Sequence, residues 1–239
     1  MFKFFYTCFN AKSLLWCSNL SADNTIILKN NFLKHVLTML RDKSTPCHRF
    51  RELVKTVGRF MAYEISNYLD LEEVNVETPL GVRAQGFKLN EMQNIILVAI
   101  LRASLPMISG ALEVLYNANV GFISAKRLED DNVSPNFEME VRIDYFNLPP
   151  VDGKTLIIMD PMLATGSTLV KVLRRIHEAG SPKNVFVASI IATPIGIERL
   201  TKEFGNLKIF TLAVDKRLND KGYIVPGLGD AGDRSFNCI

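Results

Sequence analysis

The sequence of 239 residues contains few of the side chains that build metal sites or disulfide frameworks. Its four cysteines are scattered, with no C-x-x-C pair: Cys8, Cys17, Cys47 and Cys238. This spacing indicates reduced thiols in a cytoplasmic protein. Its three histidines lie far apart, in stretches with helical spacing: His35, His48 and His177. We expect them to be surface or core residues, and neither a general base nor metal ligands.

Charge and long apolar runs are also scarce. The formal net charge is only +3, which does not indicate a nucleic-acid partner. No uninterrupted apolar run approaches the ~18 residues that span a bilayer, so we expect no membrane segment. Hydrophobic residues make up 48% of the chain, enough for a large core. The length favours one domain with an appended arm.

The most informative stretch is residues 155–168, which read TLIIMDPMLATGST. The opening apolar run is typical of a strand buried on both faces, and apolar residues at helical spacing follow the loop until Gly180. The first N–H groups of a helix lack internal partners, and the loop hydroxyls add further donors. The loop is therefore a candidate phosphate site, although the Walker pattern is absent. An ordinary capped turn is the alternative.

Two charged residues stand where strands are predicted to end. Asp160 follows the strand just described, and a carboxylate there repels phosphate, so it should face a sugar hydroxyl or a metal. Arg102 follows a second apolar run, residues 94–101, and would share the same edge if the strands are parallel. Its guanidinium suits a diphosphate. Lys126 and Arg127 follow a third predicted strand, residues 120–124, where spacing alone favours a solvated loop.

Near the end of the chain, Gly227, Gly229 and Gly232 form the pattern G-x-G-x-x-G. The dinucleotide fingerprint needs a strand before it and a helix after it. Here Pro226 precedes the pattern and only seven residues follow it. We expect instead a rigid, irregular loop whose glycines let the backbone approach a flat ligand.

Strand and helix patterns alternate along the chain and predict an α/β fold with a mostly parallel, doubly wound sheet and an N-terminal helical arm. Residues 137–145 alternate apolar and polar side chains, which predicts one half of a small antiparallel β flap. Thr45 is the expected cap of a helix that starts at Pro46. The other predicted elements are helices 32–40 and 195–204, and strands 185–191 and 207–214.

Several of these motifs resemble one family. DPMLATGST resembles the phosphoribosyl-diphosphate (PRPP) loop of phosphoribosyltransferases, and its Asp-Pro form is similar to that of uracil phosphoribosyltransferases. YIVPGLGDAGDR, residues 223–234, resembles the uracil-binding segment of that family. ILRASLPM, LRDKSTP, MAYEI and LNDKGY also match. The likeness runs from about residue 31 to the end, with the motifs in order.

The resemblance implies transfer of a phosphoribosyl group from PRPP to uracil, giving UMP and diphosphate in pyrimidine salvage, with Mg²⁺ bound to the diphosphate and no metal ligand from the protein. The implied catalytic residues are Arg102, Asp160 and Asp230. The implied PRPP-binding residues are Arg102, Arg127, Asp160, Pro161, Met162, Leu163, Ala164, Thr165, Gly166, Ser167, Thr168 and Asp230. The implied uracil-binding residues are Ile224, Gly229, Asp230 and Ala231.

By the same resemblance we expect a homodimer or homotetramer, and we keep GTP as an expected effector, because relatives of this kind self-associate and some respond to GTP. The family usually has Gly at the position of Ser104, so a positive φ there would strain the backbone. It also usually has Tyr and Asp on either side of Arg127, where this chain has Lys126 and Leu128.

The resemblance does not cover residues 1–22, which we treat as an extension of unknown role before a phosphoribosyltransferase domain at 23–239. Aromatic residues crowd this stretch, and it has neither an acidic residue nor an arginine. A targeting segment, an arm that packs on a partner subunit and an upstream start codon are the three interpretations. Two other functions compete with the main one: a non-catalytic nucleotide sensor that binds RNA or an enzyme, and transfer to a different base.

Overall fold

The computed structural model describes residues 24–89, 92–128 and 139–237. The predicted extension 1–22 and the first two residues of the predicted flap strand, Phe137 and Glu138, lie outside these ranges. Within them, no helix is long and apolar enough to cross a membrane.

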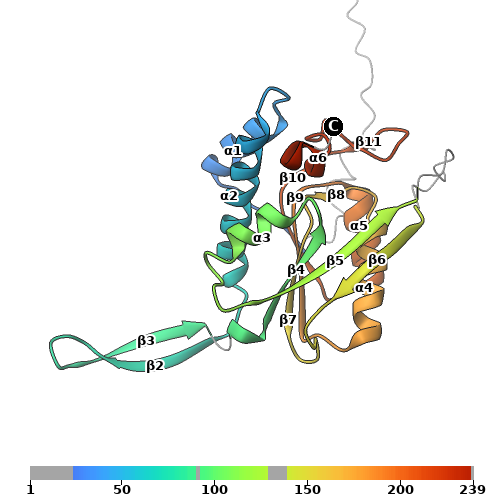
Figure 1. The fold of residues 1–239 in the computed structure, drawn as a ribbon. Coiled ribbons are helices and arrows are strands. Elements are labelled where there is room, and N and C mark those ends of the chain that lie inside the picture. The colour runs from blue at the N-terminus through green and yellow to red at the C-terminus, as the bar shows by residue number, and fades with distance from the viewer. Residues whose placement is uncertain (1–23, 90–91, 129–138, 238–239) are drawn as a thin grey trace, which may run out of the picture.

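An eight-stranded sheet forms the centre of the molecule (Figure 1). Its order is β1-β10-β9-β7-β4-β5-β6, and the short β8 also pairs with β9. All pairs are parallel except β5 with β6, so the mostly parallel sheet and the antiparallel flap are confirmed. The strands are β1 (Thr25–Ile27), β4 (Ile95–Leu101), β5 (Asn119–Arg127), β6 (Val141–Asn147), β7 (Thr155–Met159), β8 (Met162–Leu163), β9 (Asn184–Ala192) and β10 (Lys208–Val214).

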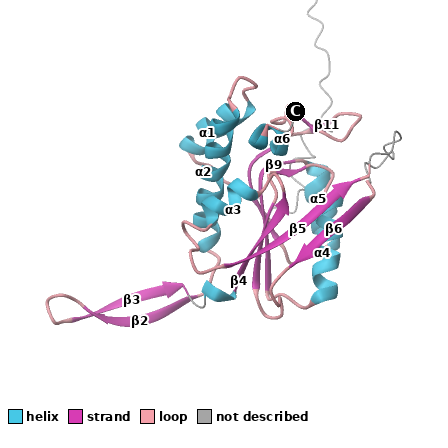
Figure 2. Ribbon diagram, viewed as in Figure 1, coloured by secondary structure: helices cyan, strands magenta, loops and turns pink. Residues whose placement is uncertain are grey.

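Helices cover both faces of this sheet (Figure 2), as a doubly wound fold requires. One face carries α1 (Asn31–Arg41), α2 (Cys47–Ser66) and α3 (Leu105–Ala111), and the other carries α4 (Ser167–Ala179) and α5 (Pro194–Glu203). Successive side chains of β4 alternate between the two cores: Ile95, Leu97 and Ala99 point to the first, and Ile96, Val98 and Ile100 to the second. This explains why the strand is a continuous apolar run.

Some boundaries differ from those predicted. The N-cap of α2 is Pro46, with no side-chain cap, so the prediction that Thr45 caps a helix starting at Pro46 is wrong. The hydroxyl of Thr45 instead donates to the carbonyl of Met39, at 2.6 Å. The third predicted strand continues through Arg127, which is thus the last residue of β5 and not part of a loop.

Two small sheets lie outside the main one. The strands β2 (Leu71–Glu77) and β3 (Arg83–Leu89) form an antiparallel hairpin that projects from the body of the molecule (Figure 1). Near the C-terminus, β11 (Arg217–Leu218) pairs with β12 (Ile224–Val225), and α6 (Ala231–Phe236) follows. The C-terminal segment is therefore less irregular than predicted. It is still not a dinucleotide fold, because β12 does not belong to the parallel sheet.

The close contact of α2 with α3 depends on glycine. A Cβ added to Gly58 would lie 2.6 Å from the Cα of Met107, and one added to Gly110 would lie 2.8 Å from the amide nitrogen of Arg59. The two backbones can approach this closely only because these side chains are missing.

We expect Gly58→Ala to lower the free energy of unfolding by about 1–3 kcal/mol, because overpacking forces the helices apart. Urea denaturation measures the change. Gly205→Ala is the matched control, since a Cβ there would meet nothing within 4 Å. Equal midpoints for the two variants would contradict the close packing of the helices.

Candidate active site

The parallel register of the sheet brings the predicted charged residues to one edge. β4 pairs with β7, with Ala99 opposite Met159, and the two strands end at Leu101 and Met159. Arg102 and Asp160 follow these ends directly. The prediction that they share an edge is confirmed, and ligands bind at this edge in open α/β sheets.

The loop after β7 is held against the sheet. The amide of Asp160 donates to the carbonyl of Ala188 at 3.1 Å, and the amide of Ile190 donates to the carbonyl of Pro161 at 2.9 Å. Met162 and Leu163 form β8 beside β9. Leu163 is 1% exposed, so its side chain belongs to the core and only its backbone could face a ligand.

Gly166 marks the turn into α4. Its φ of +80° lies in the left-handed region, and a Cβ there would lie 3.1 Å from the carbonyl oxygen of Gly196 on α5. The chain can therefore reverse direction and begin α4 at Ser167 only with glycine at this position. The N–H groups of the first turn of α4 follow at once, in the position that an anion site needs.

The hydroxyl groups of this loop are engaged by the protein itself. Ser167 Oγ accepts from the amide of Met139 at 3.1 Å and from Arg199 Nη1 at 2.9 Å, and Thr165 Oγ1 lies 3.1 Å from it. Arg199, from α5, also donates to the carbonyl of Thr165. Sequence reasoning missed Arg199, which approaches from a helix 32 positions further along the chain. In all of these contacts the Ser167 oxygen accepts, so its O–H proton is left to donate to a phosphate.

Asp160 has an unusual ionisation. Burial raises the pKa of its carboxyl to about 6, although the amide of Met162 donates to it at 3.3 Å and Arg127 contributes positive charge, both of which act to lower the pKa. The residue as a whole is only partly buried, so a ligand at this edge can reach it. A carboxylate in such a place accepts hydrogen bonds from a polar ligand strongly.

The other predicted anion ligands lie near this loop and the C-terminal segment. Arg102 is half exposed, and its Nη2 lies 3.3 Å from Asp233 Oδ1 on α6. Arg127 Nη1 lies 3.8 Å from the sulfur of Met139. Met139 thus touches both Arg127 and the loop before α4.

Ser104, the departure from the family pattern, is not strained. Its φ is −80°, in the helical region, and the peptide bond before Arg102 is cis. The Ser104 side chain is buried and its hydroxyl donates to the carbonyl of Ile100 at 2.7 Å. The positive φ that would have made serine costly is absent at this position.

The C-terminal segment lies against both halves of the candidate site. A Cβ added to Gly222 would lie 3.5 Å from Thr165 Cγ2, and one added to Gly232 would lie 3.8 Å from Arg102 Nη2. Asp230 caps α6 by accepting from the amide of Asp233 at 2.9 Å, and Asp230 itself is exposed. The C-terminal segment therefore lies next to the loop before α4 at Gly222 and next to Arg102 at Gly232.

One cavity lies apart from this region. A surface cavity between β6 and α4 is lined by Arg142, Lys171, Arg174 and Arg175 among others. Arg142 in it pairs with Asp144, and Arg175 with Glu178.

In the described part of the chain, no group of three or more His, Cys, Asp or Glu could hold a metal ion.

The fold and this edge define the chain as an α/β protein of the phosphoribosyltransferase class, with a glycine turn into a helix N-terminus beside an acidic strand end. Similarity to known proteins identifies the family. A family model for uracil phosphoribosyltransferase matches residues 27–238. The chain belongs to the uracil phosphoribosyltransferase family.

Curated relatives and one solved structure agree with this assignment. The uracil phosphoribosyltransferase of Thermococcus gammatolerans is 42% identical over 206 residues, which cover 86% of this chain and 89% of the relative. That of Metallosphaera sedula is 42% identical over 211 residues, covering 88% and 98%. A solved protein of Aquifex aeolicus is 40% identical, with a TM-score of 0.81, over 90% of this chain and 98% of its own.

The raised pKa of Asp160 predicts a pH-dependent stability. The folded protein binds the proton more tightly than the unfolded chain, where the ordinary value of 3.8 applies. The stability that the protonated carboxyl contributes is thus complete below about pH 4 and is lost as the pH rises through about 6. We expect Asp160→Asn, which cannot ionise, to melt like the wild type at low pH and at a higher temperature above about pH 7.

Melting temperatures of the unliganded proteins from about pH 4 to about pH 8 test this expectation. Glu198→Gln, which changes an exposed carboxyl on α5, is the matched control and should follow the wild-type curve. A constant difference between Asp160→Asn and wild type across the range would show that Asp160 titrates normally.

Proposed function

We propose that this chain transfers the 5-phosphoribosyl group of PRPP to N1 of uracil, giving UMP and diphosphate. One observation carries the proposal. The C-terminal segment that matches the uracil-binding motif lies beside Thr165 and Arg102, which belong to the motifs for the two phosphate ends of PRPP. Within a member of this family, that arrangement supports one cleft for both substrates.

The proposed roles follow the position of each group. Residues 164–168 bind the 5′-phosphate through the first turn of α4. Asp160 accepts hydrogen bonds from the ribose hydroxyls, and Arg102 and Arg127 bind the diphosphate. Displacement at the anomeric carbon passes through a transition state with positive ribosyl character. The work of the protein is thus to position the reactants and to stabilise charge.

The uracil edge presents a carbonyl, an N–H and a second carbonyl, which backbone groups can match. We propose that Ile224, Gly229 and Ala231 supply these groups, and that Asp230 lies between base and PRPP. Cytosine would place an amine where the site expects a carbonyl. A site built of buried hydrogen-bonding groups can reject such an analogue by roughly 10⁴-fold or more.

Magnesium fits this site as an ion that arrives with the substrate. Mg²⁺ in phosphate-transfer sites is held largely by substrate phosphates and waters, so the diphosphate of PRPP can carry the ion without a dedicated ligand from the protein. When bound to the diphosphate, it would neutralise charge on the leaving group.

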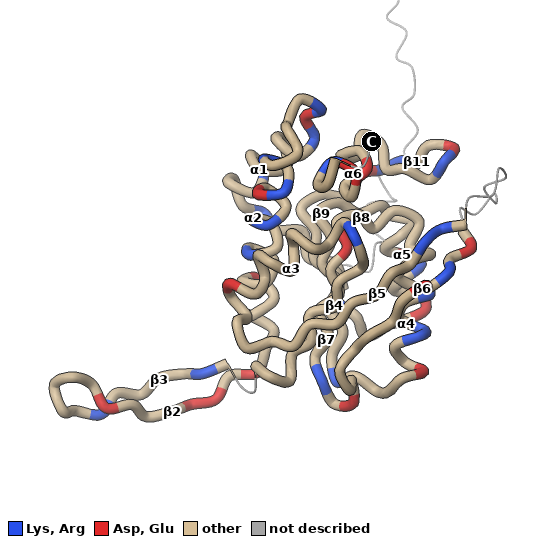
Figure 3. The backbone as a smooth tube through the Cα atoms, viewed as in Figure 1, with Lys and Arg blue, Asp and Glu red and all other residues tan. Residues whose placement is uncertain are grey.

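An assay with PRPP, Mg²⁺ and one of uracil, cytosine or hypoxanthine tests the function directly. We expect UMP from uracil and almost no nucleotide from the other two bases. A salt-sensitive RNA complex without UMP formation would favour the sensor hypothesis instead. Lys and Arg are interspersed with Asp and Glu along the described chain (Figure 3), and the formal net charge is only +3, which speaks against that alternative.

We expect Asp230→Ala and Asp230→Asn each to lower kcat by about a hundredfold or more, because both remove a charge beside the reacting groups. Asparagine still offers an oxygen to the amide of Asp233, so this variant preserves the cap of α6 and isolates the effect of charge. Initial rates of UMP formation measure the loss. Asp220→Asn, an exposed change in the same segment, is the control. Wild-type turnover in Asp230→Asn would exclude the proposed role.

We also propose that the chain self-associates through the β2–β3 hairpin. A lone two-stranded hairpin is marginally stable in water, and this one exposes apolar side chains on both faces. Leu71 and Phe87 are 60% and 62% exposed on one face, and Val76 is 45% exposed on the other. Charged residues of both signs also lie on the hairpin, where Glu72 and Lys88 stand opposite each other within the same chain. A second copy of this chain is the partner that this surface suits best.

Sedimentation at micromolar concentrations tests the proposal. We expect wild type to exceed the monomer mass of 26.9 kDa, and the double change Val76→Asp and Phe87→Asp to reduce it to that mass. Glu72→Gln on the same hairpin is the control and should keep the wild-type state. A monomeric wild type would overturn the proposal.

Three further expectations stay proposals, the first drawn from the scattered cysteines and the other two from the resemblance. We propose a cytoplasmic location, a domain spanning residues 23–239 after an extension of unknown role, and GTP as an effector. Adding GTP to the assay above tests the last of these, and deleting residues 1–22 shows whether the extension affects activity or assembly.

A further inference from the structure

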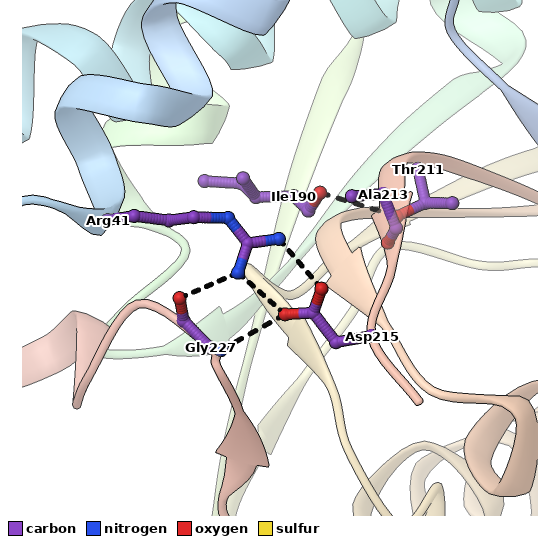
Figure 4. A network of polar contacts seen from close by, with 6 residues as sticks. All are labelled: Arg41, Ile190, Thr211, Ala213, Asp215 and Gly227. Atoms are coloured by element: carbon purple, nitrogen blue, oxygen red, sulfur yellow. Dashed lines mark hydrogen bonds and ion pairs between the residues drawn. The ribbon is translucent and has the colours of Figure 1, made fainter. Parts of the chain in front are cut away.

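A partly buried ion pair lies against the C-terminal segment. Arg41 is the last residue of α1, and Asp215 follows the end of β10. Their side chains meet in a bidentate pair, Nη2 to Oδ1 at 2.7 Å and Nη1 to Oδ2 at 2.8 Å (Figure 4). The side chain of Asp215 is only 8% exposed.

This pair binds both backbone groups of one residue. Gly227 donates its amide to Asp215 Oδ2 at 3.0 Å, and its carbonyl accepts from Arg41 Nη1 at 3.0 Å (Figure 4). Gly227 is buried and has a φ of +66°. The position and orientation of its peptide groups are thus set by α1 and β10, two elements that belong to the rigid body of the fold.

A second arginine holds the next residue. Arg234 Nη1 donates to the backbone carbonyl of Leu228 at 2.7 Å and to that of Leu40. Its Nη2 donates to the backbone carbonyl of Asp42 at 2.5 Å. Its guanidinium lies over the ring of Phe50, 4.2 Å from the centroid. The segment 227–228 is therefore tied to the corner between α1 and α2 from both sides.

We propose that Arg41 and Asp215 are positioning residues for the base-binding segment. The inference rests on the proposed function, in which Ile224, Gly229 and Ala231 bind uracil. These three residues flank Gly227 and Leu228 on either side. If the base is recognised by backbone groups, the accuracy of recognition depends on where the backbone lies. The ion pair sets that position without touching the base.

The structure favours this role over simple stabilisation for a specific reason. A pair that only stabilised the fold could take partners from any segment, yet here the hydrogen bonds beyond the pair go to the N–H and the C=O of one residue in the ligand segment, Gly227. The planar fork of arginine can reach a carboxylate and a carbonyl together, which the point charge of lysine cannot do in the same geometry.

Arg41→Lys and Asp215→Asn test the proposal. The first keeps the charge and loses the fork, and the second keeps an acceptor and loses the charge. We expect the KM for uracil to rise by about tenfold or more in both variants, because a small displacement of a binding group has effects of this size. The KM for PRPP should stay at the wild-type value, and the preference for uracil over cytosine should fall.

Arg174→Lys is the matched control. It changes a guanidinium that pairs with Glu203 between α4 and α5, with Nη2 to Oε2 at 3.0 Å, and leaves the C-terminal segment alone. Both KM values should stay at the wild-type level. Unchanged KM for uracil in Arg41→Lys and Asp215→Asn, or an equal rise in the KM for both substrates, would overturn the positioning role.

Amide hydrogen exchange at residues 227 and 228 separates this proposal from the proposed function. Faster exchange confined to that segment in Arg41→Lys and Asp215→Asn supports the positioning role even if no base is converted. Wild-type exchange there would refute it even if UMP forms. Should Arg41→Lys fail to fold, Asp215→Asn alone decides, since its neutral amide can still accept from Gly227.

Discussion

The parallel register of β4, β7 and β9 is the constraint on which the rest of the structure depends. Parallel strands end at the same edge, so residues that follow them in sequence become neighbours in space. Arg102 and Asp160 both lie at that edge because Ala99 lies opposite Met159. Their separation along the chain does not matter, because the hydrogen-bonded ladder between the strands determines the distance. Each strand is buried on both faces, so a slip in register would expose apolar side chains and is strongly disfavoured.

On that edge, the groups that would contact substrate are supported by residues from distant elements. Arg199 approaches the loop before α4 from α5, and Arg41 and Asp215 hold Gly227 from α1 and β10. In each case a guanidinium binds backbone carbonyls as well as a side-chain oxygen. Arginine suits this use because its five donors have a fixed geometry, which allows one side chain to join several segments. The family assignment and the solved relative from Aquifex aeolicus fit a fold of this kind.

The local chemistry of the site was largely readable from the sequence. The apolar run before Asp160, the small residues that follow and the helical repeat after Ser167 predicted a strand, a turn and a helix, and the structure has all three. The supporting contacts were not readable in this way. Nothing near Arg41 in the sequence indicates Asp215 as its partner, because the pair joins positions 174 residues apart. The contact of Met139 with Ser167 was missed for the same reason, since it depends on how the flap returns to the body.

The sequence by itself determined the element types, the parallel α/β architecture and the motifs that resemble one family, because side-chain periodicity and short-range backbone preferences are local properties. Only the tertiary structure decided which of those motifs share a region, how the loop hydroxyls are engaged, that Ser104 has a helical φ and that the hairpin projects from the body. These features depend on contacts between distant segments, and the free energy of such contacts depends on packing and register, which no short stretch of sequence contains.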